Sequence, residues 1–202
     1  MINGAQISRW IEQLADANAS SREQALRGLH AAGVALSAEI IEKWSADGEF
    51  RSQIRAVHAA SADPGSPASA IVVGIAVAPE NFERIRTAHS SPPLSSVPPM
   101  QDAREFELHL GADVHIDVLT SSDATGAGAI ARYLQKFGDG IQQIELYVRD
   151  VNRATAILRS RFGVEPIYSA TQPGAECTRV NFFLVSTSEG KKLLIELVES
   201  QH

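Results

Sequence analysis

The pattern of hydrophobic positions divides the chain into a helical first part and a second part in which strands alternate with helices. Near the N-terminus, Ile7, Trp10, Ile11 and Leu14 recur at the spacing of one helix face. This pattern predicts a first amphipathic helix. Short helices of this kind form stably only when their apolar faces pack on something else.

Two further helices are predicted in the first part. One begins at a capping box, Ser20–Glu23, continues through Leu26 and ends at Gly33. The other covers residues 38–44 and ends at the pair Asp47-Gly48.

Residues 1–58 loosely resemble one HEAT-like helical unit, and such units need neighbours to bury their apolar faces. We therefore expect this segment either to pack on the rest of the chain or on a second subunit, or to serve as a partner-binding arm. Residues 59–69 are rich in small residues, proline and glycine, which is typical of a linker. The remaining residues, 70–199, are predicted to form a separate folded unit.

The second part contains a weak internal repeat of a strand and a helix followed by further strands. The first copy comprises strand 71–77, helix 80–88 and strand 115–119, and the second comprises strand 141–148, helix 151–162 and strand 194–198. A connecting helix is predicted at 128–137. The trailing strand of each copy carries a carboxylate among apolar neighbours, Asp117 in the first copy and Glu196 in the second.

Alternation along these strands predicts one apolar face covered by helices and one polar face. The polar face carries His115, Asp117, Gln143, Glu145, Tyr147 and Glu196. A charged group at the centre of a strand is costly unless it is paired, hydrated or bound to a metal. The second face is therefore a candidate cleft.

A further polar stretch is predicted at the edge of this sheet. Glu105, Glu107 and His109 alternate with apolar residues, which indicates either a solvated face or, for Glu107, a residue that lines the cleft. His109 and His115 flank a predicted turn and are expected to lie near each other.

Residues 129–144 (AIARYLQKFGDGIQQI) and 194–199 (LIELVE) resemble methylmalonyl-CoA epimerase and its relatives in the vicinal oxygen chelate superfamily, which includes glyoxalase I and bleomycin-resistance proteins. The resemblance covers residues 70–199. It implies an α+β fold with paired βαβββ modules around one cleft, here preceded by a small all-α N-terminal segment.

The resemblance also implies a divalent metal held by side chains from four strands. Asp117 and Glu196 match two of the ligand positions. Val72 and Gln143 stand at positions where the family usually has histidine. The implied ligand set is therefore Asp117, Gln143 and Glu196, with Glu196 also as the catalytic base.

A set with only oxygen donors favours Mg²⁺, Mn²⁺ or Ca²⁺ over zinc or nickel, and Co²⁺ is a further candidate. The alternative is that Gln143 and Glu196 hydrogen-bond each other or water in a metal-free cleft. Two functions follow: a divergent metal-dependent lyase or isomerase acting on a small carbonyl or CoA-thioester substrate, or a small-molecule-binding module of the bleomycin-resistance type. The loops 90–101 and 170–178 are expected to set ligand specificity.

Composition limits the kinds of partner that this chain is expected to bind. The 202 residues include 18 basic and 24 acidic side chains, a net charge of −6, which argues against binding to nucleic acid or to a membrane. A single cysteine, Cys177, and the absence of a signal-peptide pattern indicate a cytoplasmic protein. The edges of curled sheets need covering, so we expect either a homodimer or an intimate pseudo-symmetric monomer.

Overall fold

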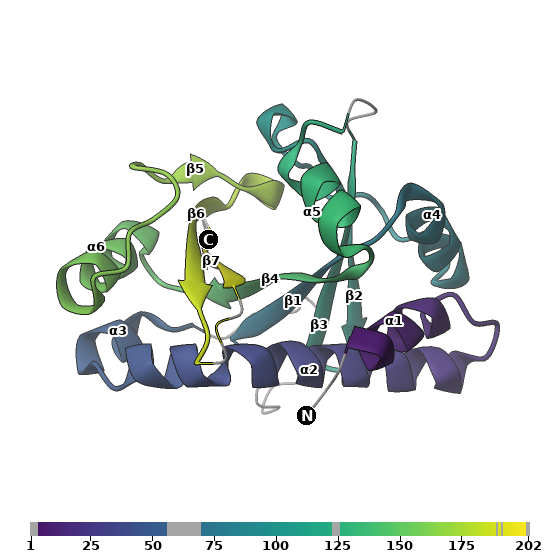
Figure 1. Cartoon of the computed structure of the whole chain (residues 1–202), viewed down its shortest axis with the longest axis horizontal. Helices are drawn as coiled ribbons and strands as arrows, with labels where there is room; N and C mark the ends of the chain where they lie inside the picture. Colours follow the sequence, from purple (N-terminus) through teal and green to yellow (C-terminus); the bar gives the residue numbers. More distant parts are fainter. Residues whose placement is uncertain (1–3, 56–69, 123–125, 189, 191, 201–202) are drawn as a thin grey trace.

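Helices cover the convex face of a curled sheet in the computed structural model, which describes residues 4–55, 70–122, 126–188, 190 and 192–200 (Figure 1). The helices are α1 (Gly4–Gln13), α2 (Ala19–Ser45), α3 (Gly48–Gln53), α4 (Pro79–Ala88), α5 (Ala129–Phe137) and α6 (Val151–Phe162). The strands are β1 (Ile71–Ala76), β2 (Ala103–Leu110), β3 (Val114–Ser121), β4 (Gly140–Tyr147), β5 (Gln172–Pro173), β6 (Arg179–Ser186) and β7 (Lys192–Glu199). The expected α+β fold with a helical N-terminal segment is confirmed.

The seven strands lie in the order β2-β3-β1-β4-β7-β6-β5. In the first half β1 runs parallel to β3, and in the second half β4 runs parallel to β7. The halves join where β1 and β4 pair antiparallel. Each half therefore places a repeat's first strand beside its last strand.

The two halves differ in one respect. The second has the expected succession β4, α6, β5, β6 and β7, whereas the first has only β1, α4, β2 and β3 in the part that the structure describes. The segment that precedes β2 contains four prolines between residues 92 and 99. Proline has no N–H to give to a strand ladder. This segment instead reaches β2 through a hydrogen bond from Ser95 N to Glu105 O, at 2.9 Å.

The start of α2 corrects the sequence prediction. The helix begins after Asn18, whose side-chain oxygen accepts hydrogen bonds from the backbone N–H groups of Ser20 and Ser21 at 2.9 and 3.3 Å. The capping box at Ser20–Glu23 is therefore wrong as the start of this helix. Asparagine satisfies two of the free N–H groups of the first turn, which is the usual reason for its preference at this position.

Gly33 does not end a helix, because α2 continues without a break for 27 residues. A Cβ at Gly33 would lie 2.4 Å from Cγ2 of Val73, so glycine lets the helix approach β1 closely. The pair Asp47-Gly48 follows the end of α2, and Asp47 caps the next helix, α3, through bonds from Glu49 N and Phe50 N.

The N-terminal helices share a hydrophobic core with the sheet. The helix α2 packs across β3, β1 and β4, and so supports both halves from below (Figure 1). Its buried Trp44 meets Phe50 of α3 and Phe183 of β6 edge to face, with ring centroids 5.7 and 6.4 Å apart. The helical segment thus packs on the rest of the chain. The predicted linker 59–69 lies outside the described residues.

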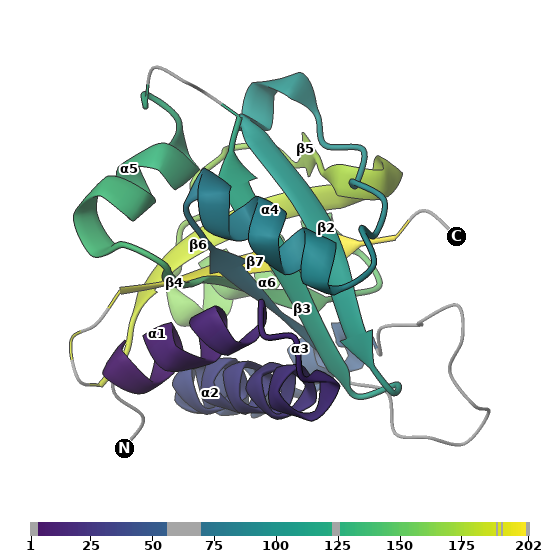
Figure 2. The same ribbon diagram turned by 90° about the vertical axis from the view of Figure 1, so that its right-hand side faces the viewer.

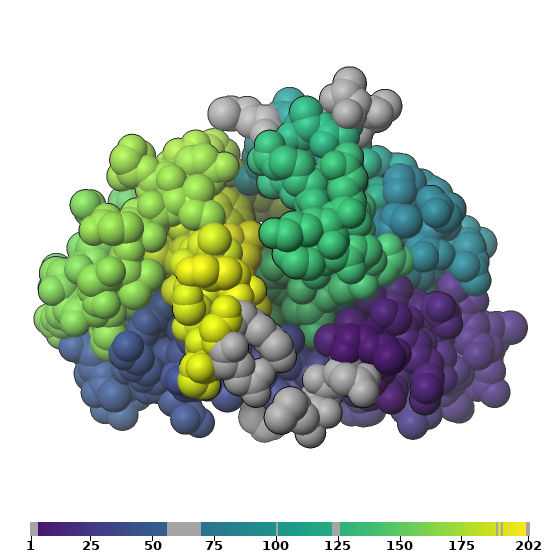
Figure 3. Space-filling view, in the orientation of Figure 1, coloured from purple at the N-terminus to yellow at the C-terminus, as the bar shows by residue number. Residues whose placement is uncertain are grey.

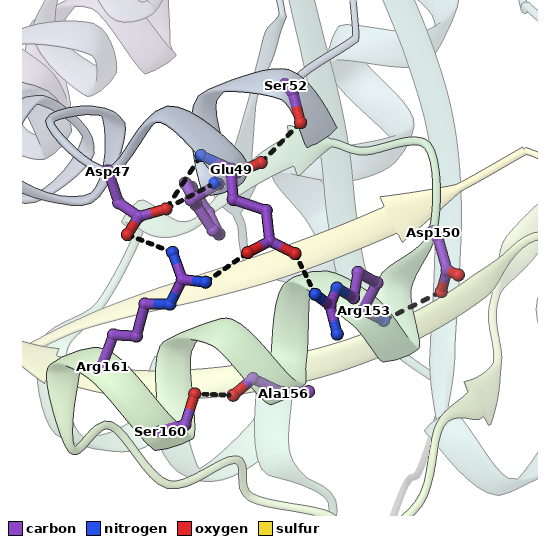
Figure 4. A network of polar contacts seen from close by, with 9 residues as sticks. Asp47, Glu49, Ser52, Asp150, Arg153, Ala156, Ser160 and Arg161 are labelled. Atoms are coloured by element: carbon purple, nitrogen blue, oxygen red, sulfur yellow. Dashed lines mark hydrogen bonds and ion pairs between the residues drawn. The ribbon is translucent and has the colours of Figure 1, made fainter.

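The remaining helices pack at the sides. Figure 2 shows α4 beside β2, where Phe82 and Phe106 stack edge to face at 4.8 Å. The short helix α3 lies against α6, where Arg161 pairs with Asp47 at 2.5 Å and with Glu49, and Arg153 also pairs with Glu49 (Figure 4). Exposed pairs contribute little individually, but these three pairs connect α3 of the N-terminal segment to α6 of the second half.

Candidate functional site

The concave face of the sheet encloses a cavity of about 540 Å³. Figure 3 shows the surface hollowed between α5 on one side and β6 and β7 on the other. Both halves of the sheet contribute to its walls. Six of the seven predicted site residues line it, namely Glu107, Asp117, Gln143, Glu145, Tyr147 and Glu196.

The strand registers bring the central residues together. Glu145 of β4 lies opposite Glu196 of β7, while Gly74 of β1 lies opposite both Asp117 and Gln143. A Cβ at Gly74 would lie 2.5 Å from Cγ of Gln143. Because Gly74 has no side chain, Gln143 has room to lie across β1 at this position.

Gln143 joins two buried carboxyl groups. Its Nε2 donates to Oε2 of Glu196 at 2.7 Å and to Oε1 of Glu145 at 3.0 Å. The Asp117 and Glu145 carboxyl groups lie within hydrogen-bonding reach of each other. Asp117, Glu145 and Glu196 are only 4, 6 and 7 % exposed. The expected hydrogen bond between Gln143 and Glu196 is thus present.

Burial and mutual repulsion change the acidity of these groups. Burial raises the pKa of Asp117 well above its usual range, and the charge of Glu145 adds to this rise. Burial likewise raises the pKa of Glu145 and of Glu196. Glu105, on β2 at the cavity wall, has its pKa raised to about 8 by burial and by the charges of Glu145 and Glu107. With a pKa of about 8, Glu105 can hold and release a proton near neutral pH.

His115 is not among the residues that line the cavity. It is 1 % exposed, and its Nε2 lies 3.1 Å from the backbone oxygen of Ala112. Its Nδ1 lies 2.8 Å from Nδ1 of His109, which confirms the expected proximity of these two histidines. His109 Nε2 in turn lies 2.9 Å from Glu107 Oε2, and this bond lowers the pKa of Glu107. His115 therefore reaches the cavity wall only indirectly, through its contact with His109 and the bond between His109 and Glu107.

The side chains as arranged do not fit the implied metal set. Within the described residues, no group of three or more histidine, cysteine, aspartate or glutamate side chains is placed to hold a metal ion. Gln143 turns its NH₂ group, a donor, toward Glu196 and Glu145. Val72 is apolar and 4 % exposed, so it supplies no ligand from β1.

The loops 90–101 and 170–178, which were expected to set ligand specificity, complete the cavity wall. The sequence did not predict how these loops contact each other. They meet where Ser96 N donates to Oε1 of Glu176 at 2.6 Å, and where Gln101 Nε2 donates to the backbone oxygen of Pro173 at 3.0 Å. Tyr168, from the loop before β5, also lines the cavity. No sequence pattern marked Glu176 or Tyr168, because irregular loops carry no periodicity.

Comparison with solved structures identifies the fold. Over 72% of this chain and 97% of the other, the structure matches methylmalonyl-CoA epimerase from Mycobacterium tuberculosis at 31% sequence identity and a TM-score of 0.55. It also matches a Streptomyces coelicolor methylmalonyl-CoA epimerase variant in complex with 2-nitronate-propionyl-CoA, at 25% identity and a TM-score of 0.55, over 67% of this chain and 96% of that one.

A third match is a methylmalonyl-CoA epimerase in complex with methylmalonyl-CoA and NH₄⁺, at 25% identity and a TM-score of 0.53, over 64% of this chain and 92% of that one. No protein-family model and no curated protein matches the sequence significantly. Among the described residues, no helix combines the length and the apolar character needed to cross a membrane. The curled two-part sheet, the cleft and the identity to the mycobacterial enzyme together show that the chain belongs to the methylmalonyl-CoA epimerase family of the vicinal oxygen chelate superfamily.

Proposed function

We propose that this chain is an epimerase-like isomerase that removes and returns a proton at the carbon next to the carbonyl of a small CoA thioester. The observation that carries this proposal is the group of three buried carboxyls, Asp117, Glu145 and Glu196, on the wall of one cavity. General acid–base catalysis needs groups whose pKa lies near the working pH, and burial moves these carboxyls in that direction.

The roles follow from the hydrogen bonds. Glu196, on β7, acts as the base, and the Gln143 amide orients its carboxylate. Asp117, on β3 in the other half of the sheet, returns the proton, and its neighbour Glu145 holds it in the protonated form. Because the two groups belong to opposite halves, a substrate between them can lose a proton on one side and regain it on the other.

The substrate class rests on the relatives. Two of the matched structures hold methylmalonyl-CoA or 2-nitronate-propionyl-CoA. A cavity of about 540 Å³ has the size of a site for a small organic ligand. The protein is proposed to work as a homodimer, which light scattering in solution tests directly.

Deuterium exchange tests the activity. Purified protein is incubated with propionyl-CoA and with methylmalonyl-CoA in D₂O, and mass spectrometry follows incorporation at the carbon next to the carbonyl. We expect deuterium incorporation with wild-type protein. In Glu196→Gln we expect the exchange rate to fall by at least about 100-fold, which is the usual rate contribution of one general base. Full exchange in that variant, or none in the wild type with either thioester, contradicts the proposal.

Two controls sharpen this assay. Glu12→Gln changes an exposed residue of α1 and is expected to leave exchange unaltered. Addition of Mg²⁺, Mn²⁺, Ca²⁺ or Co²⁺ tests whether the exchange reaction needs a metal. If exchange depends strictly on one of these ions, the Gln143 amide must turn so that its oxygen, rather than its NH₂ group, faces the carboxyls.

A second candidate function is binding without chemistry. It is favoured by the hydrogen bonds of Gln143, which tie Glu145 and Glu196 together as a closed polar cluster. Thioester binding measured by calorimetry, with no deuterium incorporation, would support this second candidate over the first.

A further inference from the structure

Most side chains on the cavity wall that can donate a hydrogen bond are already in use. Leaving the carboxyl groups aside, five of them donate to other parts of the chain, namely Gln101, Arg132, Gln143, Gln172 and Thr178. Within the described residues, the side chains of three others on the same wall form no hydrogen bond, namely Gln142, Tyr147 and Tyr168. A ligand in the cavity therefore meets three uncommitted side-chain donors.

Tyr147 belongs to the carboxyl cluster. It follows Glu145 by two residues on β4, so both side chains lie on the concave face of the sheet. Burial raises the pKa of Tyr147 above its usual range, and the charges of four cavity carboxyls add to the rise, those of Glu145, Asp117, Glu107 and Glu196. The half-buried hydroxyl therefore keeps its proton and remains a neutral donor among these carboxyls.

The other two uncommitted donors are placed differently. Tyr168 is 45 % exposed, and its ring lies edge to face on Phe182 at a centroid distance of 6.0 Å. Gln142 lies at a bulge in β4, where Gln143 pairs with Gly74 and the next pair is Ile141 with Ile75. Its Oε1 is buried and has no hydrogen-bond partner. Of the three donors, Tyr147 is thus the one that stands among the carboxyls of the proposed proton transfer.

The proposed reaction needs a donor at the carbonyl oxygen of the thioester. When Glu196 takes the proton, the electron pair of the broken C–H bond forms a C=C bond, and the carbonyl pair moves onto the oxygen. This negative charge develops on a wall rich in carboxyls, where it is costly without a hydrogen bond. As arranged, Gln143 directs its NH₂ group to Glu145 and Glu196, so it is not available for that oxygen.

We propose that the hydroxyl of Tyr147 donates a hydrogen bond to the carbonyl oxygen of the thioester and stabilises the enolate. The hydroxyl keeps its own proton throughout. Glu196 carries the proton that leaves the carbon, and Asp117 supplies the proton that arrives as the electron pair returns. This assignment rests on the proposed function and adds a catalytic residue to it, one that meets the substrate oxygen rather than the carbon.

Two ligands separate the enolate from the ground state. In 2-nitronate-propionyl-CoA, the ligand of one matched structure, the carbon next to the carbonyl is planar and its charge is spread over neighbouring oxygens, as in an enolate. Propionyl-CoA has no such charge. Dissociation constants are measured by calorimetry on the full chain at pH 7.5. In Tyr147→Phe, which removes only the hydroxyl, we expect binding of the nitronate to weaken at least about tenfold and that of propionyl-CoA to stay within about threefold.

Deuterium exchange gives a second measurement on the same variant. In Tyr147→Phe, kcat for exchange is expected to fall about 100-fold with KM nearly unchanged, because the lost bond is stronger in the transition state. Tyr133→Phe is the matched control. The Tyr133 hydroxyl lies outside the cavity lining and donates to the backbone oxygen of Ile141 at 2.8 Å, so its removal is expected to alter neither kcat nor the preference for the nitronate.

A measurement that leaves Tyr147 in place covers the case in which Tyr147→Phe does not fold. The chain has three tyrosines, so labelling with 3-fluorotyrosine gives three ¹⁹F signals. Tyr133→Phe and Tyr168→Phe each remove one signal and thereby assign the third to Tyr147. We expect the Tyr147 signal to shift further on binding of the nitronate than on binding of propionyl-CoA, and further than the other two signals.

Several results overturn the assignment of Tyr147. They are no detectable binding of the nitronate to wild type, an equal loss of both ligands in Tyr147→Phe, or a Tyr147 signal that the nitronate leaves unmoved. Wild-type exchange in Tyr147→Phe would also overturn it and leave the proposed function standing. Conversely, absence of exchange in wild type contradicts the proposed function, while the nitronate preference still decides whether Tyr147 contacts the ligand oxygen.

Discussion

Replacing Glu105 by glutamine tests the electrostatics of the cavity through its effect on stability. The pKa of Glu105 is raised from 4.5 to about 8 by burial and by the neighbouring charges of Glu145 and Glu107. A carboxyl whose pKa is higher in the folded than in the unfolded chain favours folding while it is protonated. Its contribution is therefore complete below about pH 4.5 and is lost as the pH rises through about 8.

The magnitude follows from these two values. One unit of pKa difference corresponds to about 1.4 kcal/mol. Between pH 6 and pH 8 the unfolded carboxyl is ionised throughout, while the folded one goes from protonated to half ionised. The free energy of unfolding is then expected to fall by about 2 kcal/mol over this interval because of Glu105 alone. For a chain of this size that equals a drop of about 5 °C in melting temperature.

Urea and thermal denaturation of wild type and Glu105→Gln at pH 6, 7 and 8 measure this difference. The variant is expected to be more stable relative to wild type at pH 8 than at pH 6, by about 2 kcal/mol. The half-buried His30 and His89 and the buried His115, whose pKa values are lowered by burial, are present in both proteins, so their contributions cancel in the comparison. Glu12→Gln, at an exposed position of α1, is the matched control. Parallel pH profiles for wild type and Glu105→Gln would refute the reasoning.

Two glycine substitutions test the packing that forms the site. Gly33→Ala places a Cβ 2.4 Å from Cγ2 of Val73 and is expected to destabilise the chain by about 1–3 kcal/mol in urea denaturation, whereas Gly4→Ala, with no atom within 4 Å of the added carbon, serves as its control. Equal stability of the two variants would show that α2 does not approach β1 this closely. Gly74→Ala places a Cβ 2.5 Å from Cγ of Gln143, and should abolish thioester exchange while retaining the native circular dichroism spectrum. Wild-type exchange in Gly74→Ala would show that Gln143 does not orient the carboxyls.

Much of the fold could be predicted from periodicity. The ranges 80–88, 141–148 and 151–162 correspond to α4, β4 and α6, with boundaries that differ by one residue or none. Strand alternation also placed Asp117, Gln143, Glu145, Tyr147 and Glu196 on one face, and all five line the cavity. The reason is local: successive side chains of a strand point to opposite faces whatever the strand packs against.

Several features depended on contacts between distant parts of the chain. Gly33 reads as a helix end, but the close approach of α2 to Val73 of β1 requires glycine there. His115 shares a strand face with Asp117, yet its hydrogen bonds to His109 and Ala112 hold it away from the cavity wall. A pattern along one strand cannot report such partners.

The sequence by itself determined that Asp117, Gln143, Glu145, Tyr147 and Glu196 share the cleft face of their strands, because strand alternation depends only on local backbone geometry. Tertiary structure alone decided how those residues meet. The pairing of β1 with both β3 and β4 brings Asp117 and Gln143 to either side of Gly74, whose lack of a side chain leaves room for Gln143 to lie across β1. The charge balance of the cavity was also decided in three dimensions, since Asp102 and Glu176 reach its wall from segments far apart in the chain.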